Sequence, residues 1–163
     1  VYDGATGLHN RTYFIDRLTL ECDRSERSGR GFSVLALHIR AMSSERDKDA
    51  GISEATMQRT AEVINSQTHP SDLVGHLSAT ELAILAIGVD REHRKKLLDR
   101  LREAVASDLS AAGKGTPKAV VTGGAATYGV DGEDPAALIQ AARSAATMGS
   151  ASARSNARSR DAA

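Results

Sequence analysis

Hydrophobic and polar positions alternate along this chain with two distinct periods. Apolar residues three and four positions apart predict amphipathic helices, and short apolar runs bounded by Gly, Pro or polar residues predict strands. Helices are expected from about residue 11 to 28, around residues 57–64, from residue 90 to about 107, and from residue 135 onward; strands are expected at 32–39, 73–77, 81–87 and 118–128.

Capping and turn signals support these boundaries. Asn10 can cap the first helix, and Asp134 followed by Pro135 places a capping acid before a proline at the first helical position. Residues 78–80 leave room only for a tight hairpin between two strands. Gly123 and Gly124 weaken the last strand. The final helix is expected to bury Leu138, Ile139, Ala142 and Ala145.

The order of these elements predicts an α/β fold, with helices on the faces of a mixed, largely antiparallel sheet. A length of 163 residues indicates one domain. We assign that domain to residues 1–148. Residues 149–163 contain no aliphatic side chain larger than Ala, so this tail is expected to be polar and frayed or disordered.

Composition excludes several classes of function. Lys plus Arg and Asp plus Glu both number 21, so the net charge is zero, which disfavours a nucleic-acid partner. Aromatic residues are only 3% and Trp is absent, which disfavours a base-stacking surface. The single cysteine, Cys22, excludes an internal disulfide and a cysteine-based zinc site, and a buried thiol is expected.

No apolar run approaches the roughly 20 residues that span a bilayer, so no membrane contact is expected of this piece. The chain begins at Val1 without an initiator Met, and we interpret it as a part of a longer protein. No resident cofactor is expected.

The segment from Asp3 to Arg11, which reads DGATGLHNR, resembles the opening signature D-x-L-T-G-L-x-N-R of the GGDEF domain family. The resemblance continues to about Ser155 and includes the order of the elements. Active members are diguanylate cyclases, which join two GTP molecules, one on each of two facing domains, into cyclic di-GMP. The resemblance implies a fold similar to that of nucleotide cyclases and a cytoplasmic domain of a bacterial signalling protein.

The family's reaction needs two Mg²⁺ ions, which activate a hydroxyl and neutralise the triphosphate. Magnesium takes hard oxygen ligands, mostly carboxylates. The resemblance places His38 and Ile39 at the first metal position, where the family has an Asp-Ile-Asp-like run, and Arg40 follows. An imidazole is a poor Mg²⁺ ligand, and a guanidinium repels the ion.

The second metal position falls in the predicted hairpin. The family has G-G-[DE]-E-F there, and this chain has Ser78, Ala79, Thr80, Glu81 and Leu82. The two glycines of the family allow close approach of phosphates, whereas Ser78 and Ala79 add side chains. Thr80 replaces a carboxylate, so only Glu81 is left as a metal ligand.

Other nucleotide positions are also altered. The resemblance aligns Arg154 with a phosphate-binding Arg, but Ser150 with the family's phosphate-binding Lys. Glu54 aligns with a guanine-binding acid only through a one-residue gap, and the family's guanine-reading Asn falls on Arg46 or Asp47. The last helix has Ala142 and Arg143 where the family has Ala-Asp.

An inhibitory product site, R-x-x-D, precedes the signature hairpin in many active members. Here the two positions are His69 and Asp72. Because His cannot form the bidentate contact of Arg with phosphate, product binding at this site is not expected.

Three functions are compatible with the sequence. The first is a catalytically inactive GGDEF domain that regulates, or interacts with, neighbouring domains or a protein partner; whether it forms a homodimer stays open. The second is a GTP-binding sensor that uses Glu54, Glu81 and Arg154. The third is a weak nucleotide-processing enzyme. We prefer the first, with weak or no GTP binding.

Overall fold

The structure, a computed structural model, describes residues 9–41, 52–111 and 119–161. Four helices and four strands follow one another in the predicted order, and their bounds are α1 (Arg11–Ser28), β1 (Phe32–Ala41), α2 (Glu54–Gln67), β2 (Leu73–Ser78), β3 (Glu81–Ile87), α3 (Arg94–Ala111), β4 (Ala119–Thr127) and α4 (Pro135–Asp161).

The strands form one sheet in the order β2-β3-β1-β4. All three pairings between these strands are antiparallel. The helices α2 and α3 each connect two strands that are separated by one intervening strand, which is why both cross a face of the sheet. The predicted α/β fold with a largely antiparallel sheet is confirmed.

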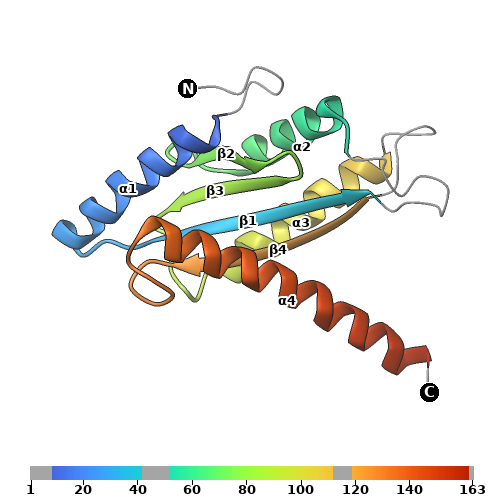
Figure 1. Ribbon diagram of the computed structural model, residues 1–163. Helices are drawn as coiled ribbons and strands as arrows, with labels where there is room; N and C mark the ends of the chain where they lie inside the picture. The colour runs from blue at the N-terminus through green and yellow to red at the C-terminus, as the bar shows by residue number, and fades with distance from the viewer. Residues whose placement is uncertain (1–8, 42–51, 112–118, 162–163) are drawn as a thin grey trace.

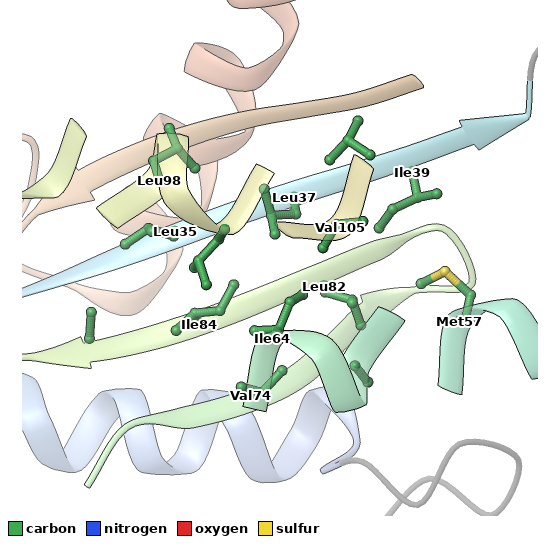
Figure 2. Close-up of a cluster of buried hydrophobic side chains, with 14 of the residues drawn as sticks. Leu35, Leu37, Ile39, Met57, Ile64, Val74, Leu82, Ile84, Leu98 and Val105 are labelled. Atoms are coloured by element: carbon green, nitrogen blue, oxygen red, sulfur yellow. The ribbon is translucent and has the colours of Figure 1, made fainter. Parts of the chain in front are cut away.

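Helices cover both faces of the sheet (Figure 1). Alternate residues of β1 point to opposite faces, as the period of two in a strand requires. Leu35, Leu37 and Ile39 pack with α2 and α3, as Figure 2 shows. Val34 and Ala36 pack on the other face, with α1 and α4. The sheet therefore carries two separate hydrophobic cores.

The predicted caps and the hairpin are confirmed. The Asn10 side chain accepts a hydrogen bond from the Tyr13 N–H at 2.9 Å, and Asp134 accepts one from the Ala137 N–H at 2.9 Å. Ser78 pairs with Glu81, so a two-residue turn joins β2 to β3. Its residues do not have positive φ, so the turn forms without glycine.

Details of α3 and α4 differ from the prediction. The first regular residue of α3 is Arg94 rather than Asp90. The Asp90 side chain accepts the His93 N–H and its carbonyl oxygen accepts the Arg94 N–H, so Asp90 caps the turn that leads into the helix. On α4 the buried small residue is Ala146 rather than Ala145. Ala146 lies four residues after Ala142 and so falls on the same side of the helix.

The helix α4 also continues through residues 149–161, where the sequence predicted a frayed or disordered tail. That stretch is rich in Ala, Ser and Arg and contains no proline, so nothing in it stops a helix. Its last turns extend past the sheet (Figure 1). None of the helices in the described parts of the chain is both long and apolar enough to cross a membrane.

Cys22 lies on the buried side of α1 and is 7% exposed. Burial, aided by the nearby carboxylates of Asp134 and Asp23, raises the pKa of its thiol to about 11. The thiol therefore stays protonated at neutral pH, as expected for a packing residue.

Gly123 and Gly124 allow helices to approach β4 closely on both faces. A Cβ at Gly123 would lie 2.7 Å from the side chain of Leu98 on α3. A Cβ at Gly124 would overlap the Ala142 carbonyl oxygen and the Ala146 backbone nitrogen on α4. The backbone of α4 therefore rests directly on β4 at Gly124.

Replacing Gly124 with Ala is expected to destabilise the fold by about 2–4 kcal/mol, because the added methyl group must displace helix backbone rather than a flexible side chain. The measurement is urea unfolding followed by circular dichroism. Gly31→Ala is the matched control, since a Cβ there meets nothing within 4 Å. Equal stabilities of the two variants would refute the close packing of α4 on β4.

Candidate functional site

A cavity of about 620 Å³ opens on the α4 side of the sheet, at the C-terminal end of β1. Strands β1, β3 and β4 and helix α4 all contribute to its walls. Its polar lining comprises His38, Arg40, Glu81, Thr122, Arg143 and Thr147.

One face of β1 is apolar in its first part and polar toward its C-terminal end. Phe32, Val34 and Ala36 are buried beneath α1 and α4. His38 and Arg40 continue the same face, and they are half-buried and exposed, respectively. The helices therefore cover the apolar part of this face, and the cavity lies over the polar part.

The register of the sheet sets the neighbours of His38. Its Cα lies opposite Glu81 on β3 and opposite Thr122 on β4. Directly opposed residues in an antiparallel pair share a face. His38, Glu81 and Thr122 thus form a row across three strands on the floor of the cavity.

Glu81 forms a bidentate ion pair with Arg143 of α4. The Arg143 Nε donates to Glu81 Oε2 at 2.9 Å, and Nη2 donates to Oε1 at 3.1 Å. The hydroxyl of Ser78 also donates to Glu81 Oε1, at 2.9 Å. The side chains of Arg143 and Glu81 are 33% and 22% exposed, respectively. Three donors therefore hold the Glu81 carboxylate at the end of the hairpin.

The packing of α4 on β4 positions Arg143 for this contact. The backbone atoms of Ala142 and Ala146 and the methyl group of Ala145 face Gly124. Arg143 follows Ala142 directly, so its side chain leaves the helix beside this contact and reaches Glu81 from above β1. It also lines a second cavity, of about 640 Å³, between α1 and α4.

The remaining hairpin positions have separate environments. Ala79 is exposed at the turn, and Leu82 is fully buried in the core on the α2 side. The Thr80 N–H donates to Ser78 Oγ at 3.3 Å. The Thr80 carbonyl oxygen accepts from the Ile39 N–H at 2.9 Å. The Ile39 side chain is fully buried on the α2 side, away from the cavity.

The expected nucleotide contacts are not brought together among the described side chains. Glu54 is the exposed first residue of α2 and is absent from the described lining of the cavity. Arg154 lies within α4, but its side chain is outside the described set, as is that of Ser150. Residues 3–8, Arg46 and Asp47 lie outside the described residues altogether.

Asp72 has a structural role that the sequence did not indicate. One carboxylate oxygen accepts the His69 N–H at 3.0 Å, and the other accepts the Ile87 N–H at 3.0 Å. These contacts close the turn before β2 and join it to the end of β3. The His69 ring lies 2.7 Å from Ser71 Oγ. Hydrogen bonds within the protein therefore use both His69 and Asp72.

The ion pair between Arg143 and Glu81 is the main site feature that sequence reasoning missed. The two residues are 62 positions apart, and no local spacing rule connects them. The sequence did contain a signal for this ion pair. Arg143 is a cation at a position where the resemblance leads one to expect an acid, and Glu81 is the one carboxylate that remains in the hairpin.

Within residues 9–41, 52–111 and 119–161, no group of three or more His, Cys, Asp or Glu side chains is arranged to hold a metal ion. Glu81 is the sole carboxylate among the cavity-lining residues that the structure describes.

Comparison with known proteins gives a consistent result. A family model described as "Diguanylate cyclase, GGDEF domain" matches residues 1–156. The chain is 27% identical over 164 residues to "Cyclic di-GMP phosphodiesterase NbdA" of Pseudomonas aeruginosa, covering 96% of this chain and 20% of that protein. It is 24% identical over 104 residues to "Probable diguanylate cyclase DgcT" of Escherichia coli, covering 63% of this chain and 23% of that protein.

The chain thus spans about a fifth of the length of these curated relatives. Among solved structures, a sensory box/GGDEF family protein from Caulobacter crescentus superimposes with a TM-score of 0.77 at 25% identity. The match covers 93% of this chain and 98% of that one.

A double-mutant cycle of Glu81→Gln and Arg143→Gln, measured by urea unfolding, is expected to give a coupling free energy of roughly 0.5–1.5 kcal/mol, because the contact is bidentate and partly buried. The matched control is the exposed pair Lys95–Asp99, for which about 0.3–0.5 kcal/mol or less is expected. A coupling at Glu81 and Arg143 no larger than in the control would contradict the geometry.

Proposed function

The chain belongs to the GGDEF domain family. Within this family, we propose that it is a catalytically inactive member that works as a regulatory or protein-interaction module. Its partners would be neighbouring domains of a longer cytoplasmic signalling protein, or a separate protein. The observation that carries this proposal is the ion pair of Glu81 with Arg143.

The donor set of the cavity does not fit Mg²⁺. This ion is commonly bound through one or two carboxylates together with substrate phosphates. The described lining offers a single carboxylate, that of Glu81. Arg143 already donates a hydrogen bond to each of its two oxygens, and Ser78 donates a further one to Oε1. His38 and Thr80, at the positions where the resemblance expects carboxylates, supply an imidazole and a neutral hydroxyl.

The charge of the cavity also opposes a divalent cation. The guanidinium groups of Arg40 and Arg143 both line it. In a partly water-excluded site, like charges repel more strongly than they do in bulk water. A metal ion would therefore have to separate Arg143 from Glu81 and remain beside the positive charges of Arg40 and Arg143.

One of the two curated relatives is consistent with a regulatory role, whereas the other is named as a probable diguanylate cyclase. NbdA is named as a cyclic di-GMP phosphodiesterase, and the part that this chain resembles is a fifth of that protein. A domain of this family thus occurs in a protein that is named for the opposite reaction. A module that modulates another domain is consistent with that setting.

The purified chain, incubated with GTP and either Mg²⁺ or Mn²⁺, is expected to form no cyclic di-GMP when the products are separated by chromatography. Calorimetry with GTP and Mg²⁺ is expected to show weak or no binding, since the cavity lacks carboxylates that could hold the ion.

The triple variant His38→Asp, Thr80→Glu, Arg143→Asp serves as the positive control, because restoring carboxylates should produce Mg²⁺-dependent binding of GTP. Steady product formation by the unmodified chain, lost in Glu81→Ala, would disprove the proposal. Micromolar binding of GTP with Mg²⁺ and no product would instead favour a nucleotide sensor.

A further inference from the structure

Helices α1 and α4 form a groove on the outer side of the molecule, next to the cavity at the hairpin. This groove is the second cavity, of about 640 Å³, and its described walls come from the start of α1 and from residues 134–147. Arg143 and Thr147 line both cavities, whereas no strand contributes to the described lining of this one. We call it the α1–α4 groove.

Part of the surface of the α1–α4 groove is apolar. Ile15 of α1 is half-buried there, and Ile139 of α4 is 6% exposed. Pro135 and Ala136 add apolar surface at the first turn of α4. Both helices already pack on the sheet with their buried sides, so this surface faces outward and is available to a second molecule.

The two helices run in opposite directions along the groove (Figure 1). Arg11, the first residue of α1, lines the groove together with Arg143, which lies well inside α4. Asp134 precedes α4 and lies near Cys22, which is about 16 Å further along α1 than Arg11. Arg11 and Asp134 therefore mark opposite ends of the groove.

The end at Arg11 is basic. Arg11 is exposed, and its Nη1 donates to the Leu77 carbonyl oxygen at 3.2 Å. This hydrogen bond positions the side chain, but a carbonyl oxygen does not neutralise the charge of a guanidinium. The N-terminus of α1 adds a partial positive charge at the same end.

The end at Asp134 is acidic, because several carboxylates gather there. Burial, with the carboxylates of Asp134 and Asp23, raises the pKa of the Cys22 thiol. Partial burial, with the nearby carboxylate of Glu133, likewise raises the pKa of Tyr128. Asp134, Asp23 and Glu133 are all exposed, so their negative charge is accessible from outside the molecule.

We propose that the α1–α4 groove is a dimerisation surface, on which a second copy of this chain packs about a twofold axis through the centre of the groove. Such an axis places the basic end of each groove against the acidic end of the other. Arg11 of each copy then faces the partner's Asp134, and Ile15 and Ile139 lie between these two contacts. The inference adds a second copy to the partners proposed above and does not depend on the loss of catalysis.

The charge pattern favours a second copy over an unrelated partner. A groove with a single sign of charge would repel its own copy, whereas a groove with opposite ends is complementary to itself when the two copies are antiparallel. The apolar part of the groove is small compared with the interfaces of obligate dimers. We therefore expect a weak, reversible dimer.

The test is sedimentation equilibrium of the chain in EDTA, without nucleotide, from micromolar to submillimolar concentrations. A monomer–dimer equilibrium is expected that weakens at high salt. Arg11→Glu and Asp134→Arg should each weaken the dimer about tenfold or more, because the twofold axis converts each change into two like-charge contacts. Lys96→Glu is the matched control: it reverses an exposed cation of α3, on the other face of the sheet, and should leave the equilibrium unchanged.

An equimolar mixture of the Arg11→Glu and Asp134→Arg chains gives the most specific result. In each variant alone both contacts join like charges, whereas in the mixed dimer both join opposite charges again. The mixture is therefore expected to recover the dimer. Asp134 also caps α4 by accepting the Ala137 N–H, so Asp134→Asn serves as a second variant. It keeps a capping side chain and should weaken the dimer with an unchanged circular dichroism spectrum.

A chain that stays monomeric at submillimolar concentration would overturn the inference. A dimer that both charge reversals leave unchanged, or a mixture that stays monomeric, would overturn it as well. Because these experiments contain neither GTP nor a metal ion, such outcomes leave the proposed inactivity intact. Conversely, formation of cyclic di-GMP by the unmodified chain would disprove the inactivity and leave this inference standing.

Discussion

The direct contact between the backbone of α4 and strand β4 at Gly124 determines the arrangement of the cavity. Because Gly124 has no side chain, Ala142 and Ala146 can rest against the strand. This contact fixes both the height and the rotation of α4 above the sheet. Arg143 is thereby placed where it can reach Glu81 from across β1. The close packing of α4 on Gly124 of β4 thus places the positive charge of Arg143 opposite Glu81 of the hairpin.

The same sheet face has two parts with different physical roles. Helices α1 and α4 cover Val34 and Ala36, and this burial stabilises the fold. Beyond them, His38 is half-buried and Arg40 is exposed. The described helices do not pack on these two residues as closely as they pack on Val34 and Ala36. The cavity is therefore a product of where helix coverage stops. Changes of residue there can alter its chemistry without disturbing either hydrophobic core.

The sequence predicted the features that depend on neighbouring residues. The Asn10 and Asp134 caps, the tight hairpin at residues 78–80 and the strand that begins at Phe32 all follow from local rules, and the structure confirms them. Features that depend on distant partners were missed. The ion pair between Arg143 and Glu81 joins residues far apart in the chain, and the two hydrogen bonds of Asp72 include one to the distant end of β3. The burial of Ala146 rather than Ala145 depends on the exact rotation of α4 about its own axis, which no local pattern specifies.

The central claim is that Arg143, rather than a metal ion, neutralises Glu81. The most direct measurement is a ¹H–¹⁵N spectrum of the labelled chain during titration with Mn²⁺, since a bound paramagnetic ion broadens the amide signals near it. The account predicts that amides of residues 36–40 and 78–82 broaden no more than exposed amides elsewhere in the chain. Selective broadening of these two segments at micromolar Mn²⁺ would show that a metal ion binds beside Glu81 and would contradict the account.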